Sequence, residues 1–184
     1  MVVLIVLSVV VIFFFVWAIG TYNGLVSLRE NVKNSWSQID VQLKRRHDLI
    51  PNLVETAKGY MGHEKDTLER VIKARQIAVD ASNVKDKIQA ENMLTGTLRS
   101  LMAVAENYPN LKADQQMIRL QEELASTENS IASARQYYNE VVNRLNVAVQ
   151  TFPDTLVAGM FGFKTADFFQ LDNVAERDVP QVKF

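Results

Sequence analysis

The side chains best suited to metal or acid–base chemistry are the two histidines, His47 and His63. The run from His63 to Thr67 begins like the H-E-x-x-H zinc signature, but Thr67 stands where the second histidine ligand belongs. His47 has no histidine or carboxylate repeated at ligand spacing around it. The chain has no cysteine, which excludes a thiol nucleophile and a cysteine-ligated metal. We therefore expect no metal site, no catalytic residues and no cofactor.

Lys44, Arg45, Arg46 and His47 form the densest basic cluster of the chain. Three interpretations are open: ion pairs within a helical bundle, contact with a partner protein, and binding of anionic lipid headgroups. Lys44 lies 24 residues beyond Gly20, or roughly 36 Å along a straight helix. That distance is several Debye lengths at physiological salt. Ion pairs within a bundle are therefore the favoured interpretation, and lipid binding is the least favoured.

The composition divides the chain into an apolar start and an ordinary polar remainder. Residues 1–20 contain 18 apolar residues and no charge, so all 41 charged side chains (20 Lys+Arg and 21 Asp+Glu) lie in the other 164 residues. About one residue in four of this remainder is therefore charged, which is the usual share for a soluble globular domain. The formal net charge of −1 offers no general attraction to nucleic acid. We expect neither a nucleic-acid partner nor a small-molecule substrate.

The apolar start is long enough to cross a membrane. It comprises about 20 residues, or roughly 30 Å of helix, and it lacks the basic region and small-residue cleavage site of a signal peptide. Trp17 and Tyr22 stand where an interfacial aromatic belt belongs. The first charged residue is Arg29, and the next basic residue is Lys33. By the positive-inside rule, we expect a single-pass protein of the bacterial cell (inner) membrane with its N-terminus outside and its helical domain in the cytoplasm.

Gly20 and Gly24 form a small-xxx-small pair at the inner edge of this span. Such pairs let transmembrane helices approach closely. The alternative is that the two glycines only loosen the junction between span and domain. Both interpretations remain open, and the first predicts packing between spans in a homo-oligomer.

Heptad spacing of apolar residues predicts long helices after the span. One seam of apolar residues continues from Leu25 to Tyr60, interrupted by Arg29 and Arg46. Its phase is the same on both sides of Pro51, which favours one nearly continuous helix over residues 1–58 with a kink at Pro51. Further helices are expected to open near His63 and after residue 84. The most regular repeat, from Met117 to Phe152, predicts a helix of about 40 residues. Three aromatic residues are expected to pack in or beside the bundle core rather than stack on a ligand: Trp36, Tyr137 and Tyr138.

The predicted fold is therefore all-α, with an N-terminal transmembrane helix that continues into an antiparallel four-helix bundle of long helices. The predicted domains are an anchor over residues 1–22, a bundle over residues 23–153, and an apolar membrane-proximal segment with a C-terminal tail over residues 154–184.

The segment from residue 152 to residue 171 holds five of the nine phenylalanines. Asp154 is expected to cap a short amphipathic helix, and Gly162 to end it. One face of this helix is expected to hold Leu156, Val157, Met160 and Phe161. If helices alternate in direction, this segment returns to the level of Gly20. Seven residues are then expected to contact the headgroup layer or a neighbouring copy, the alternative being that they cap their own bundle: Phe152, Leu156, Met160, Phe161, Phe163, Phe168 and Phe169.

Several motifs resemble those of the LemA family. They include the run from Asp40 to Tyr60, the run from Glu106 to Leu111, the run from Ala134 to Asn139, and Phe152-Pro153-Asp154. The resemblance covers about residues 20–170 and implies an anchored helical-bundle protein without established enzymatic activity. The family is similar to a protein needed for magnetosome membrane formation. Some relatives begin with a lipoprotein signal and its cysteine, which this chain lacks.

Two functions follow as hypotheses. The first is a non-enzymatic coiled-coil-like scaffold that self-associates and organises or remodels the membrane, with the lipid bilayer and copies of itself as partners. The second is an adaptor that tethers a membrane protein, such as a membrane protease or an envelope-stress component, through an exposed helix face. An enzyme is the least favoured class.

Overall fold

The computed structural model describes residues 1–169, and every regular element within that range is a helix. The all-α fold class predicted from the sequence is therefore confirmed. That a single four-helix bundle extends over residues 23–153 remains a prediction. The division into three domains also remains a prediction. The tail over residues 170–184 lies outside the described part of the chain.

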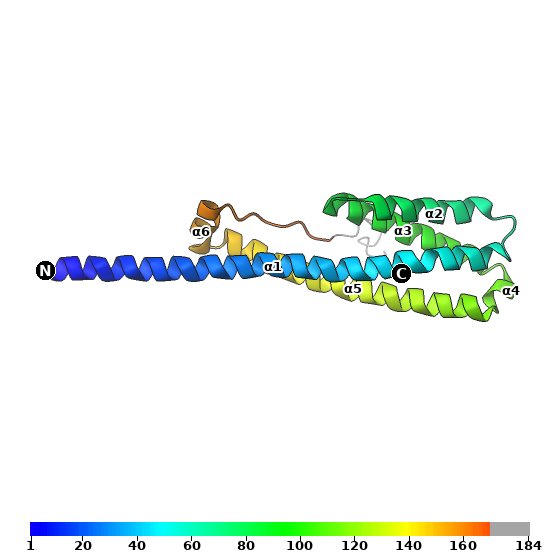
Figure 1. Cartoon of the computed structure of the whole chain (residues 1–184), viewed down its shortest axis with the longest axis horizontal. Coiled ribbons are helices and arrows are strands. Elements are labelled where there is room, and N and C mark those ends of the chain that lie inside the picture. The colour runs from blue at the N-terminus through cyan, green and yellow to red at the C-terminus, as the bar shows by residue number, and fades with distance from the viewer. Residues whose placement is uncertain (170–184) are drawn as a thin grey trace, which may run out of the picture. The chain divides into compact units, whose positions relative to one another are not determined.

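The first helix, α1 (Val2–Lys58), is continuous from the apolar start through Pro51, as the constant phase of the seam predicts (Figure 1). A proline removes the amide donor that would bond the carbonyl four residues earlier, here that of His47. Arg75 replaces that donor, since its Nε donates to the His47 carbonyl oxygen at 2.7 Å. This side-chain bond helps to explain why the helix tolerates Pro51 in its interior. The predicted kink at this position remains a prediction.

Two antiparallel helices follow, α2 (Lys65–Asp80) and α3 (Val84–Ala105), and they lie side by side (Figure 1). Asn83 caps α3, because its Oδ1 accepts a hydrogen bond from the Asp86 amide at 2.8 Å. The short helix α4 (Pro109–Lys112) was not predicted. Pro109 was expected only to stop a helix, whereas here it occupies the first helical position, where its missing amide costs nothing.

The longest C-terminal element is α5 (Gln115–Gln150), which confirms the long helix predicted from the heptad repeat. Asp114 caps it by accepting a hydrogen bond from the Met117 amide at 2.9 Å. This bond and the hydrogen bond from the Tyr60 hydroxyl hold the pKa of Asp114 below its ordinary value. The last helix is α6 (Asp154–Phe161).

The described residues form two compact units, to both of which α1 and α5 contribute. One unit contains Val41–Ile131 and Phe169. In it, the second part of α1, helices α2, α3 and α4, and the first part of α5 share one apolar core, with members such as Leu53, Val71, Leu94, Leu111 and Met117. Burial of these side chains is the main force that holds this unit together.

The other unit contains Met1–Asp40 and Ala132–Phe168. It consists of the first part of α1, the last part of α5, and α6 with the segment that follows. Its small apolar cluster is formed by Leu25, Val157 and Ala158, with Trp17 and Phe163 packed against it. α6 is therefore attached to α1 at the residues that follow the apolar stretch.

Candidate membrane-contact site

α6 is held against α1 at the point where the apolar stretch ends. The Thr21 hydroxyl donates a hydrogen bond to Asp154 Oδ1 at 3.3 Å. The ring of Tyr22 meets those of Phe161 and Phe163 edge-on, with centroids 4.8 Å and 5.7 Å away. These contacts place α6 beside Thr21 and Tyr22, as the alternating helix directions predict.

Asp154 itself does not cap α6, which corrects one expectation. The residue at the N-cap position is Pro153, and Asp154 is the first residue of the helix. Its carboxylate is engaged by Thr21 instead. Gly162 ends the helix as predicted: it adopts φ +70, the left-handed region that glycine enters without steric cost, and the Phe163 amide donates to the Ala158 carbonyl.

The segment after α6 is fastened to α5 by side-chain bonds to its backbone. The side-chain Nδ2 of Asn146 donates to the Ala166 carbonyl oxygen at 2.9 Å. The side-chain Oδ1 of Asn146 accepts a hydrogen bond from the Ala166 backbone amide at 2.8 Å. The Tyr138 hydroxyl donates to the Asp167 carbonyl at 3.0 Å. Burial, together with the charge of Asp167, raises the pKa of Tyr138 above its ordinary value. Trp36 packs edge-on against the ring of Tyr138, as expected for a residue of the helix interface.

The seven apolar residues predicted to contact lipid or a neighbour divide into two groups. Five are exposed: Phe152, Leu156, Met160, Phe161 and Phe168. Phe163 is half-buried and Phe169 is buried, so these two also pack within their own chain. Val157, which was expected to share a face with Leu156 and Met160, is buried against Leu25 instead. α6 and Phe163 thus pack on their own unit with one side and leave five apolar side chains of the segment exposed.

Four residues of α1 that the sequence analysis singled out lie close to the exposed apolar residues of α6 along the chain of α1: the glycine pair Gly20 and Gly24, and the belt residues Trp17 and Tyr22. A Cβ atom added at Gly20 or Gly24 would meet no atom within 4 Å, so both glycines face open space in the single chain. Trp17 is half-buried against the cluster of α6 residues, and Tyr22 carries the aromatic contacts described above. Arg29 lies over the ring of Phe163, 5.4 Å from its centroid, in a cation–π contact.

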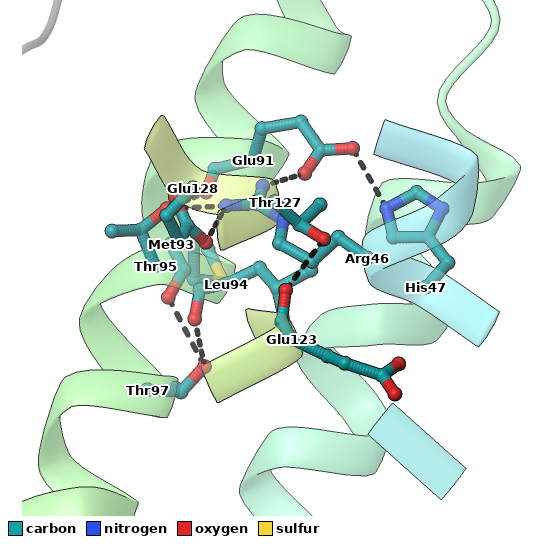
Figure 2. Close-up of polar contacts among 10 residues, drawn as sticks. All are labelled: Arg46, His47, Glu91, Met93, Leu94, Thr95, Thr97, Glu123, Thr127 and Glu128. Atoms are coloured by element: carbon teal, nitrogen blue, oxygen red, sulfur yellow. Dashed lines mark hydrogen bonds and ion pairs between the residues drawn. The ribbon is translucent and has the colours of Figure 1, made fainter. Parts of the chain in front are cut away.

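The basic cluster of α1 provides the main buried polar network of the other unit (Figure 2). The guanidinium of Arg46 is completely buried and pairs with the buried carboxylate of Glu91 on α3. Its Nη1 donates to Glu128 Oε1 on α5 at 2.6 Å and to Thr95 Oγ1 at 2.9 Å. The ring Nε2 of His47 lies 2.8 Å from the second oxygen of Glu91. These contacts support the interpretation of Arg46 and His47 as bundle ion pairs, whereas Lys44 and Arg45 are exposed.

The ionisation of Glu91 reflects two opposing effects. Burial raises the pKa of its carboxyl group, but the hydrogen bond from His47 and the charges of Arg46 and His47 outweigh burial and hold the pKa below its ordinary value. The carboxylate is therefore charged at neutral pH and compensated on both oxygens. The side chains of Arg46 and Glu91 have no exposed surface, and the contacts of this network connect α1, α3 and α5.

The described residues give no sign of a metal centre. No group of three or more His, Cys, Asp or Glu side chains within residues 1–169 is placed to hold a metal ion. His63 is exposed in the turn that precedes α2.

A groove of about 520 Å³ lies between α3 and α5. Its floor is apolar, including Leu98, Met102 and Leu124, and its rim carries Arg99 and Glu106.

Comparison with known proteins identifies the family. The model of the LemA family matches residues 35–184, which is most of the chain. The chain belongs to the LemA family. Protein LemA of Metamycoplasma hominis is 25% identical over 172 residues, covering 91% of this chain and 77% of the relative.

Magnetosome proteins are also similar to this LemA-family chain. Magnetosome protein MamQ 2 of Paramagnetospirillum magneticum is 26% identical over 194 aligned positions, covering 91% of this chain and 71% of the relative. Magnetosome protein MamQ of Magnetospirillum gryphiswaldense is 24% identical over 174 positions, covering 80% of this chain and 64% of the relative. None of these names denotes an enzyme.

Several contacts of the LemA-family chain were not predicted. Each of them joins residues that are far apart in the sequence. They are the hydrogen bonds of Arg46 to its partners, of Asn146 to Ala166, and of Thr21 to Asp154. One signal was available: Arg46 occupies a position of the apolar seam, where a charge requires a buried partner. The sequence alone does not say which acidic residue that partner is.

Proposed function

We propose that this chain is a non-enzymatic, membrane-anchored helical scaffold whose copies associate and organise or shape a bacterial cell membrane. The observation that carries the proposal is the exposed apolar start of α1. Its apolar side chains from Val2 to Val16 are 46% to 76% exposed, and α1 is long and apolar enough to cross a membrane. Such a surface requires lipid to cover it, and α1 continues from it without a break.

Self-association is supported by the two glycines at the end of the span. Gly20 and Gly24 lie one helical turn apart and are open in the single chain, so another helix has room to approach there. The similarity to proteins named as magnetosome proteins supports a role in organising membrane.

The proposed orientation rests on the charges that follow the span. Arg29 and Lys33 are the first basic residues after it, which favours the cytoplasm for the helical units and the bacterial inner membrane for the span. A cysteine introduced at Ser82, which is exposed, is then inaccessible to an impermeant thiol reagent in intact cells. Labelling of Ser82→Cys while a cytoplasmic control protein stays unlabelled would reverse the orientation.

A second candidate function is favoured by the groove between α3 and α5. An adaptor needs an apolar surface that a partner helix can enter, and the floor of this groove supplies one. In that role the chain tethers a membrane protein, such as a membrane protease or an envelope-stress component. Substitution of Met102 by Glu then abolishes binding to an isolated candidate partner without changing the mass of the assembly, whereas a scaffold function needs no partner in the groove.

Reconstitution tests the scaffold function directly. Full-length protein in liposomes of bacterial phospholipid, imaged by electron cryomicroscopy, is expected to form clusters and to deform the vesicles. The matched control is Gly20→Leu/Gly24→Leu, because a Cβ atom added at either position meets no atom of the single chain within 4 Å. Single, scattered copies in undeformed vesicles would contradict the proposal.

A further inference from the structure

α6 presents one buried and one exposed apolar face. Val157 and Ala158 are 4% and 1% exposed, whereas Leu156, Met160 and Phe161 are 53%, 79% and 57% exposed. Phe152, just before the helix, is 74% exposed. We call these four exposed residues the α6 face. No charged residue lies between Asp154 and Lys164, so the whole helix after its first residue is uncharged.

The α6 face is fixed at the end of the apolar stretch of α1. The stretch ends at Ile19, and α6 is bonded to Thr21, stacked on Tyr22 and packed on Leu25. These contacts lie within one unit of the chain and do not depend on a second copy. Wherever the apolar stretch enters lipid, α6 is therefore held at the boundary between acyl chains and headgroups.

The charges near α6 fit this boundary. Arg29 lies over the ring of Phe163, and Lys164 is exposed three residues after the end of α6. Basic side chains with apolar stems are suited to the headgroup layer, where the stem lies against apolar groups and the charge reaches water. Trp17 and Tyr22 have the amphipathic rings that are enriched at the same level.

We propose that α6 is an interfacial helix that lies in the headgroup layer of the leaflet at the C-terminal end of the span, with the α6 face inserted among the acyl chains. This inference rests on the membrane anchor of the proposed function, and it names lipid as the occupant of the α6 face. Two helices, the span and α6, then occupy volume in one leaflet, while the span alone crosses the other leaflet. The added volume in a single leaflet supplies a physical means of bending the membrane.

A second copy is a poorer occupant for this surface. The four exposed side chains offer roughly 500 Å² of apolar area, from their exposure and the size of large side chains. A stable protein interface buries about 800 Å² on each partner. The lipid that covers the exposed side chains of α1 is continuous with the α6 face and requires no further partner.

The test uses the absence of cysteine from the chain. Met160→Cys is labelled with an NBD fluorophore and the full chain is reconstituted in phosphatidylcholine vesicles that contain lipids with a doxyl quencher at acyl carbon 5 or 12. Blue-shifted emission is expected, with stronger quenching by the carbon-5 lipid than by the carbon-12 lipid. The matched control is Met93→Cys on α3, another exposed methionine, for which little quenching is expected from either lipid.

The outcomes separate this inference from the proposed function. Quenching at residue 160 no greater than at residue 93 overturns the interfacial helix, and a blue shift without quenching assigns the α6 face to a second copy. A label at Val10→Cys reports on the anchor independently, because carbon-12 quenching is expected there whether or not α6 enters the lipid. If the residue 10 label is not quenched, the anchor and the proposed function fail together. A monomeric mass with quenching at residue 160 overturns self-association alone.

Discussion

The guanidinium of Arg46 and the carboxylate of Glu91 form an ion pair in which neither side chain reaches solvent. The pair joins α1 to α3, and the additional bond from Arg46 to Glu128 includes α5. Charges removed from water are costly unless both are compensated. The network therefore fixes how these three helices meet more than it adds to stability.

Replacement of Glu91 by Gln should lower the free energy of unfolding by about 3 kcal/mol, since it leaves the buried charge of Arg46 with only Glu128 to compensate it. Urea denaturation of the detergent-solubilised protein, followed by circular dichroism, measures the change. The control is Glu140→Gln, which breaks the exposed pair with Arg144 and should cost less than about 0.5 kcal/mol. Equal losses in the two variants would show that burial of the pair does not matter.

The same carboxyl group predicts a loss of stability in acid. Because the folded pKa of Glu91 is lowered, its contribution is present above the ordinary glutamate pKa of about 4.3 and is lost as the pH falls through the folded value. The groups that face it are Arg46 and His47. The difference in unfolding free energy between the native chain and Glu91→Gln should therefore shrink below about pH 4.3. A difference that is constant down to pH 3 would be inconsistent with this origin.

The bond from Arg75 to the His47 carbonyl predicts a coupling with Pro51. Arg75→Met should cost about 1.5 kcal/mol in the native chain, where the carbonyl has lost its helical donor. In a Pro51→Ala background, the amide of residue 51 can bond that carbonyl, so the same substitution should cost about 1 kcal/mol less. A double-mutant cycle in urea denaturation measures the coupling. Additive effects would show that the two residues act independently.

Much of the helical architecture could be predicted because it depends on local signals. The phase of the seam across Pro51 indicated a continuous α1, and the repeat from Met117 to Phe152 indicated α5. Gly162 was identified as a helix end because its residue type suits a left-handed conformation. The return of α6 to the level of Gly20 followed from the expectation that the helices alternate in direction.

Pairing between distant residues could not be predicted in the same way. The seam position of Arg46 is a signal that its charge needs a buried partner, but many acidic residues are available, and only the packing of helices selects Glu91. Asp154 has the residue type of a cap, yet a hydrogen bond from Thr21, 133 positions away, engages its carboxylate instead. Periodicity also placed Val157 on the same face as Leu156 and Met160, whereas contact with Leu25 buries Val157 and leaves the other two exposed.

The two faces of α6 predict opposite effects of polar substitution. Leu156→Gln/Met160→Gln should change thermal stability little, because both side chains are exposed, while reducing the deformation of liposomes. Val157→Gln should lower stability by about 2 kcal/mol, because it places an amide among apolar neighbours. Thermal denaturation and electron cryomicroscopy of the same preparations provide both readouts. A large loss of stability in the double variant would show that the α6 face is part of the protein core.

The mass of the assembled protein tests the scaffold function most directly. The chain has a mass of 20.9 kDa, and light scattering of full-length protein in mild detergent and in lipid nanodiscs gives the protein mass after the detergent or lipid is subtracted. A scaffold predicts a homogeneous multiple of the chain mass that Gly20→Leu/Gly24→Leu reduces, while Gly96→Leu, at another open glycine, leaves it unchanged. A mass of one chain in both environments would contradict self-association and with it the scaffold.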